Sequence, residues 1–259
     1  MIIELFGPPG SGKTTFAHEL SRHLRENGYK ADVMLSYQQS TAQNNVDRYG
    51  MLYFVYRICT ALVHTTYTIA RSPIAQEEID ISGGLLKIIP PSRMIWRIRL
   101  WQYIVNLSRH WSAAKKSEDI VIFDQGFVQA IGSLAIFHGA ANDALLSEAL
   151  DLAPQADFAI RLMAPRDIVE TRLRERMRRE SKAERLFEAR ISTNLEAFGI
   201  FDDMSRILSK TSRSILSIAP ADQASTKHCV AYIEKIILAH LLGIGDMHAA
   251  ERTQLSDEI

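Results

Sequence analysis

The sequence has few cysteines, no net charge and no long uninterrupted apolar run. Its two cysteines, Cys59 and Cys229, lie far apart and lack metal-ligand spacing, so we expect reduced thiols in a reducing compartment. Thirty basic and thirty acidic residues cancel, which removes the overall charge that would favour a nucleic-acid or membrane partner. Arg57 and His64 interrupt the most apolar segment, 51–70, which therefore predicts a buried helix and not a membrane span.

A phosphate-binding loop near the amino terminus is the clearest positive feature. Residues 7–14 complete the pattern G-x-x-x-x-G-K-[ST] between an apolar run at 1–6 and a helical stretch, which is the context that the motif requires. Glycines let successive N–H groups converge on an anion, and the helix dipole adds positive charge. We predict ATP binding by Gly7, Pro8, Pro9, Gly10, Ser11, Gly12, Lys13, Thr14 and Thr15.

The loop also bears on metal binding and location. The Lys13 ammonium is expected at the β- and γ-phosphates, and the Thr14 hydroxyl is expected to ligate Mg²⁺. Because the loop starts at residue 7, we expect no signal peptide before it and a cytoplasmic protein.

Apolar runs alternate with helical patterns along the rest of the chain, which indicates the α/β class. Two long helices are predicted at 51–71 and 92–116, with an irregular segment between them that contains Gly83, Gly84 and Pro90. The alternation predicts a three-layer P-loop fold, with helices on both faces of a parallel sheet and ligands at the carboxyl edge of its strands. The five expected strands cover 1–6, 31–37, 119–124, 156–162 and 214–218.

Asp124 ends the third apolar run, where a carboxylate would lie near Mg²⁺ and opposite Thr14. The next residue is Gln125 instead of a second carboxylate. This difference argues against a dedicated motor ATPase, because many such enzymes use the adjacent carboxylate to activate water.

A one-sided arginine series follows the fourth strand. At about 100° per residue, Arg172, Arg176 and Arg179 share one helix face, where planar guanidinium groups can bind phosphate oxygens. The alternative is a solvated helix whose charge is balanced by Glu175 and Glu180.

These features resemble the thymidylate kinase and deoxynucleoside kinase group of P-loop kinases. The run 172–180 is similar to the arginine-rich lid of that family, and 184–188 resembles the acid-Arg-x-x-Glu element that follows the lid. The resemblance implies a five-stranded parallel core, ATP as donor, Mg²⁺ and a lid that closes before phosphoryl transfer. It implies an ATP-binding role for Arg179, metal ligation by Thr14 and Asp124, and catalytic roles for Lys13, Asp124, Arg172 and Arg176.

The departures from the family lie on the acceptor side. Gln125 stands where the family usually has Arg, and Gln38-Gln39 stands where Glu-Pro is usual. The resemblance therefore implies an intact donor site and a rebuilt acceptor site beneath the helical segment. Within that segment there are two interpretations of Arg93, Arg97, Arg99 and Arg109. They replace the missing acceptor contacts, or they are surface or snorkelling arginines on long core helices.

We predict one kinase-like domain at 1–243, with a helical insertion at 51–117, a lid region at 164–190 and a flexible tail at 244–259. The predicted activity is transfer of the γ-phosphoryl group of ATP to a nucleotide, nucleoside or related small molecule. A regulatory ATPase or switch, and an ATP-binding module without kinase activity, are the alternatives. No Asn-Lys-x-Asp motif supports a GTPase. The exposed faces of the long helices would be natural homodimer surfaces.

Overall fold

A parallel five-stranded sheet lies at the centre of the protein, in the order β2-β3-β1-β4-β5. The computed structural model describes residues 1–35, 75–179, 191–211 and 213–241. β1 is the middle strand, so the phosphate loop that follows it lies between the ends of β3 and β4. The strands are β1 (Ile2–Phe6), β2 (Ala31–Met34), β3 (Ile120–Phe123), β4 (Phe158–Leu162) and β5 (Ile215–Ile218).

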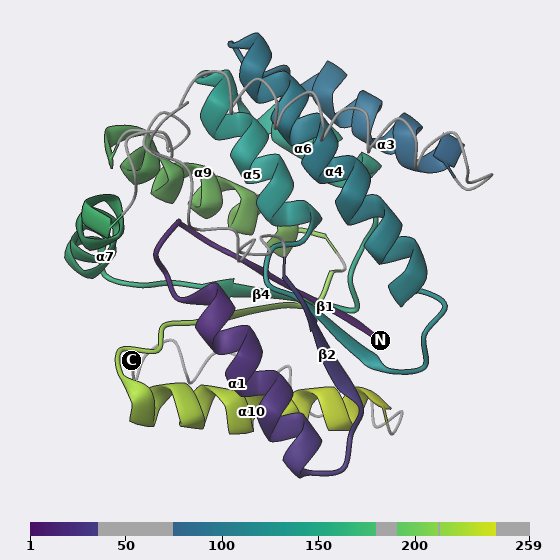
Figure 1. Ribbon diagram of the computed structural model, residues 1–259, viewed down its shortest axis with the longest axis vertical. Coiled ribbons are helices and arrows are strands. Elements are labelled where there is room, and N and C mark those ends of the chain that lie inside the picture. Colours follow the sequence, from purple (N-terminus) through teal and green to yellow (C-terminus); the bar gives the residue numbers. More distant parts are fainter. Residues whose placement is uncertain (36–74, 180–190, 212, 242–259) are drawn as a thin grey trace, which may run out of the picture.

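Helices cover both faces of the sheet, which confirms the predicted three-layer α/β fold (Figure 1). One face carries α1 (Lys13–Glu26) and α10 (Gln223–Leu241). Beyond the carboxyl edge lies α7 (Arg166–Arg179). The other face carries α3 (Ala75–Ile88), α4 (Met94–Ala114), α5 (Phe127–His138), α6 (Asp143–Leu152) and α9 (Ile191–Ser209).

The side chains of β1 alternate between the hydrophobic cores on the two faces of the sheet. Ile3 and Leu5 are buried in the core beneath α1 and α10, whereas Ile2 and Phe6 belong to the larger core beneath α4, α5 and α9. Successive strand residues point to opposite faces, so an apolar strand in the middle of a covered sheet contributes to both. Glu4 falls on the same side as Ile2 and Phe6, and it is 2% exposed.

The prediction of an irregular segment between the two long helices is wrong, because most of this segment forms α3. Gly83 and Gly84 suggested a break, but Leu85 within α3 and Ile89 directly after it are fully buried in the larger core and hold the helix against it. A Cβ at Gly84 would lie 2.7 Å from Leu152 Cδ2, so this glycine permits close approach to α6. Here packing outweighs the low helix propensity of glycine.

Other predicted boundaries shift by small amounts. The second strand ends at Met34, and Leu35 beyond it is 36% exposed, whereas positions 36 and 37 of the predicted strand lie outside the described residues. The helix predicted at 92–116 is confirmed as α4. The predicted helix 51–71, the lid element 184–188 and the tail 244–259 lie outside the described residues.

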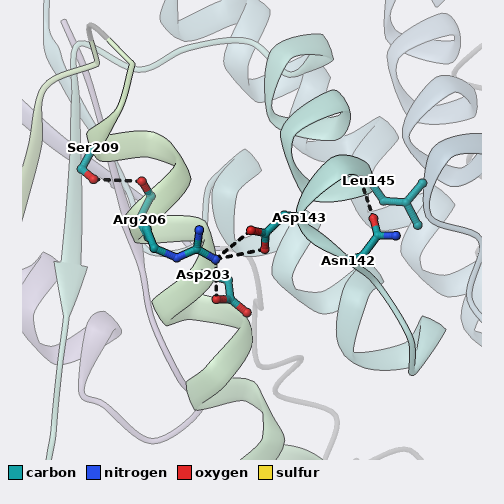
Figure 2. A network of polar contacts seen from close by, with 6 residues as sticks. All are labelled: Asn142, Asp143, Leu145, Asp203, Arg206 and Ser209. Carbon is teal, nitrogen blue, oxygen red and sulfur yellow. Dashed lines mark hydrogen bonds and ion pairs between the residues drawn. The ribbon is translucent and has the colours of Figure 1, made fainter.

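Exposed polar contacts link α9 to α6 on the outer layer (Figure 2). Arg206 on α9 donates hydrogen bonds to Asp143 at 2.9 Å and to Asp203 at 2.8 Å. Asn142 caps α6, because its side-chain oxygen accepts a hydrogen bond from the Leu145 N–H at 3.0 Å. Since both carboxylates are about half exposed, we expect these ion pairs to add little stability, and the pair with Asp143 to orient α9 against α6.

Candidate functional site

The loop between β1 and α1 has the backbone shape expected for phosphate binding. Gly7, Gly10 and Gly12 have φ values of 143°, 84° and 94°, a region that side chains with a Cβ disfavour. A Cβ at Gly7 would also lie 2.3 Å from the Leu162 carbonyl oxygen, so only glycine fits there. The first loop residue is therefore fixed between β1 and the end of β4.

Lys13 folds back into the loop. Its ammonium donates hydrogen bonds to the carbonyl oxygens of Gly7 at 2.9 Å and Pro8 at 3.0 Å, and the residue is 7% exposed. Burial lowers the pKa of Lys13 to about 8, and the nearby Asp124 carboxylate opposes this shift. A partly desolvated cation inside a loop of this shape attracts an anion.

Thr14 and Asp124 meet at the carboxyl edge of the sheet. Asp124 directly follows β3 and is 2% exposed, and its Oδ2 accepts a hydrogen bond from the Thr14 hydroxyl at 2.9 Å. The contact brings together the two oxygen-bearing side chains that the sequence proposes for Mg²⁺. Hydroxyl and carboxylate oxygens are hard donors that suit this cation.

The base of α7 rests on the loop. The Arg172 guanidinium donates a hydrogen bond to the Gly10 carbonyl oxygen at 3.1 Å. A Cβ at Gly10 would lie 3.5 Å from Val169 and 3.7 Å from Leu173, two side chains that are buried. Arg174, two residues further along α7, instead pairs with Glu170 at 2.6 Å. The structure thus brings one arginine of the predicted lid to the loop.

The other predicted lid arginines belong to the same helix. Arg176 and Arg179 are within α7, but their side chains lie outside the described residues. Their backbone thus follows that of Arg172 by about one and two turns of the same helix.

A second group of residues lies behind the loop, and the sequence analysis missed it. The Gly7 N–H donates a hydrogen bond to Gln129 Oε1, and the Val128 N–H donates one to Glu4 Oε2, both at 3.0 Å. The Tyr103 hydroxyl donates to the Gln125 carbonyl oxygen at 3.1 Å. These contacts fix the segment that follows Asp124. Its one sequence signal is Glu4, an acidic residue inside an apolar strand.

Glu4 is enclosed by the start of α5. A Cβ at Gly126 would lie 2.2 Å from Glu4 Oε2, so the glycine allows the carboxyl group to reach the helix. Burial raises the pKa of Glu4 to about 7, and the Val128 hydrogen bond and the Arg213 charge act in the opposite direction. Burial and the nearby carboxylates of Asp124 and Glu4 raise the pKa of Tyr103.

The arginines considered for the acceptor side split into two groups. Arg97 Nε donates to the Pro91 carbonyl oxygen at 2.7 Å, and the Arg99 guanidinium lies 5.3 Å from the Trp96 ring centroid. Trp96 in turn stacks on Phe137 with 3.9 Å between ring centroids. Arg99 thus packs, partly buried, against Trp96, whereas Arg93, Arg97 and Arg109 are exposed.

Comparison with known proteins agrees with this loop and fold. A family model described as AAA domain matches residues 2–199, which is more than half of the chain. The chain belongs to the AAA domain family. None of the curated proteins matches this AAA domain chain significantly.

A solved structure shares the fold of this AAA domain protein. A deoxyadenosine kinase from M. mycoides, with the products dCMP and a flexible dCDP bound, is similar with a TM-score of 0.51 and 13% identity. The match covers 92% of this chain and 100% of that chain. The same kinase with dCTP bound gives a TM-score of 0.49 at 12% identity, with the same coverage. The fold is therefore that of P-loop deoxynucleoside kinases.

The structure also bears on the membrane prediction. Within the described ranges, none of the helices combines the length and the apolar character needed to cross a membrane.

Proposed function

We propose that the protein is a phosphotransferase that moves the γ-phosphoryl group of ATP to a small-molecule acceptor, a nucleoside, a nucleotide or a related compound. The observation that carries this proposal is the meeting of Thr14 and Asp124 at 2.9 Å beside the buried Lys13 in a loop of positive-φ glycines. The kinase fold and the missing second carboxylate after Asp124 support phosphoryl transfer over motor-type hydrolysis.

The loop would bind the triphosphate through its N–H groups and the positive end of α1. Lys13 now donates to two loop carbonyls, and these bonds would be exchanged for phosphate oxygens when the nucleotide enters. The ammonium would then offset negative charge on the transferred group. Such preorganised charge is a large part of catalysis in phosphoryl transfer.

The side chains of Thr14 and Asp124 fit Mg²⁺, because they bring one hydroxyl oxygen and one carboxylate oxygen close together at the edge of the sheet. When bound, the cation would neutralise phosphate charge. Asp124 would also orient the Thr14 hydroxyl through this hydrogen bond.

The hydrogen bond from the Arg172 guanidinium to the Gly10 carbonyl oxygen supports the proposal that Arg172, within the proposed lid, contacts phosphate oxygens when the site is filled. Arg176 and Arg179 are proposed to join it from the next turns of α7. We also propose a lid at 164–190, an insertion at 51–117 and a tail at 244–259. A cytoplasmic location and a homodimer stay predictions.

Acceptor dependence of ADP formation tests the proposal. Purified protein is incubated with ATP and Mg²⁺ alone and with nucleosides, nucleotides and sugars, and ADP is measured in each case. We expect one class of acceptor to raise ADP formation well above the background without acceptor, and Lys13→Ala to abolish the increase. Equal ADP formation with every compound would contradict the kinase proposal and favour a regulatory ATPase.

A further inference from the structure

We propose that Gln129 is a positioning residue for the phosphate-binding loop, so that the helix following Asp124 sets the shape of the nucleotide site. This inference rests on the proposed nucleotide binding. Gln129 lies outside the loop motif, and it reaches the loop from the first turn of α5.

The contact is buried and specific. Gln129 Oε1 accepts the hydrogen bond of the Gly7 N–H at 3.0 Å, and Gln129 is 4% exposed. On its other side, Gly7 lies against the Leu162 carbonyl, where a Cβ would come within 2.3 Å of the oxygen. The first residue of the loop is thus held between the end of β4 and the start of α5.

Gly7 in turn holds the cation of the loop. Its carbonyl oxygen accepts a hydrogen bond from Lys13 at 2.9 Å, next to the one that Pro8 accepts at 3.0 Å. A shift of Gly7 therefore moves a partner of Lys13. Gln129 can act on the phosphate site through this short path without touching a nucleotide.

Gln129 is itself well anchored. Glu4 Oε2 accepts the N–H of Val128, the residue before it, and the Tyr103 hydroxyl donates to Gln125 at the turn before α5. Gly126 lets Glu4 approach this turn closely. The segment from Asp124 to Gln129 is therefore fixed on several sides, and it carries a metal-site candidate at one end and the loop contact at the other.

Removal of the Gln129 oxygen would leave the Gly7 N–H without this buried partner. An empty loop can relax to recover part of the loss, but a loop that binds phosphate must return to its fixed shape. The cost then appears as weaker binding, because preorganisation is lost. From the usual cost of an unpaired buried N–H, we expect ATP to bind about 10-fold more weakly.

The test compares Gln129→Met, which keeps the size of the side chain and removes the oxygen, with Ser133→Ala on the same helix. The Ser133 hydroxyl donates to the Gln129 backbone carbonyl and not to its side chain, so we expect its loss to leave the Gly7 contact in place. ATP affinity is measured by titration in the full-length protein, and amide hydrogen exchange of Gly7 is measured by NMR without nucleotide.

Gln129→Met should weaken ATP binding about 10-fold and speed exchange at Gly7, while the amide of Ile122 in β3 stays unchanged. Ser133→Ala should behave like the wild type in both measurements. Unchanged ATP affinity in Gln129→Met, or unchanged exchange at Gly7, would overturn this inference, whereas ATP binding by the wild type would leave the proposed nucleotide binding standing. A wild-type protein that binds no ATP would overturn both.

A second variant covers the case in which Gln129→Met does not fold. Gln129→Asn keeps the amide but withdraws its oxygen by one methylene, and the same two changes are expected in the same direction. Wild-type values in Gln129→Asn would overturn the inference.

Discussion

The Thr14 hydroxyl donates a hydrogen bond to Asp124 Oδ2 over 2.9 Å, although 110 residues separate the two in the sequence. The contact connects the first turn of α1 to the end of β3. It exists because β1 and β3 are parallel neighbours whose carboxyl ends meet at one edge of the sheet. The proposed metal site therefore depends on the register of two strands.

Asp124→Asn should separate metal use from nucleotide binding. The amide oxygen can still accept the Thr14 hydrogen bond, so the loop should keep its shape, but the negative charge that attracts Mg²⁺ is lost. We expect turnover to fall about 100-fold or more, because metal assistance contributes several kcal/mol to such reactions. ATP affinity without Mg²⁺, measured by titration, should change little.

Thr14→Ser is the matched control for this experiment, because it keeps the hydroxyl and should retain most of the turnover. If Asp124→Asn and the wild type respond identically to added Mg²⁺, then Asp124 has no part in binding the cation.

Arg172→Ala should lower turnover far more than it weakens ATP binding. The Arg172 guanidinium reaches the loop at Gly10, and the negative charge that it would offset develops mainly in the transition state. Mutation of comparable arginines costs about 1,000-fold or more in turnover. Turnover and ATP affinity of the variant are measured side by side with the proposed acceptor.

Arg174→Ala is the control for charge on the same helix, since Arg174 pairs with Glu170 and should be dispensable. Equal losses in Arg172→Ala and Arg174→Ala would mean that only the net charge of α7 matters. Arg176→Ala tests the other catalytic lid residue expected from the sequence, in the same assay.

The fold could be predicted largely from local patterns, but α3 could not. The apolar strands and the loop carry strong local signals, whereas Gly83, Gly84 and Pro90 suggested an irregular segment in a stretch that is mostly α3. Gly84 is needed where α3 approaches Leu152 on α6, a contact that becomes visible only in the folded chain. A glycine required by packing looks the same in sequence as a glycine in a turn.

The candidate site, like the fold, could be predicted only where its residues carry a local signal. Lys13, Thr14 and Asp124 could be proposed from motif and strand order, because each has a fixed place relative to a strand end. Gln129 and Tyr103 act through contacts between distant elements and carry no local signal. In the sequence, the one signal of this group is Glu4, an acidic residue within an apolar strand. Its hydrogen bond with the Val128 N–H could not be predicted, because it depends on how α5 packs against β1.

Gly7→Ala should be much more damaging than Gly139→Ala. Both glycines have positive φ, 143° and 86°, but a Cβ meets the Leu162 oxygen at 2.3 Å at position 7 and open space at position 139. Backbone strain alone should cost Gly139→Ala about 1–2 kcal/mol of unfolding free energy. The added clash should bring Gly7→Ala to about 3–5 kcal/mol, measured by chemical denaturation. Equal losses would show that the loop can move away from β4.

Glu4→Gln should flatten the pH dependence of stability. Burial raises the pKa of Glu4 from 4.5 to about 7, so between these values only the folded protein holds the proton. The free energy of unfolding of the wild type therefore falls as pH rises from 4.5 to 7 and stays level above, a total of about 3 kcal/mol. Gln cannot ionise, so denaturation at pH 5 and pH 8 should show this part of the decrease missing from the variant. Glu148→Gln, on the exposed surface of α6, should keep the wild-type decrease. Parallel curves for Glu4→Gln and the wild type would mean that Glu4 ionises as freely in the folded chain as in the unfolded one.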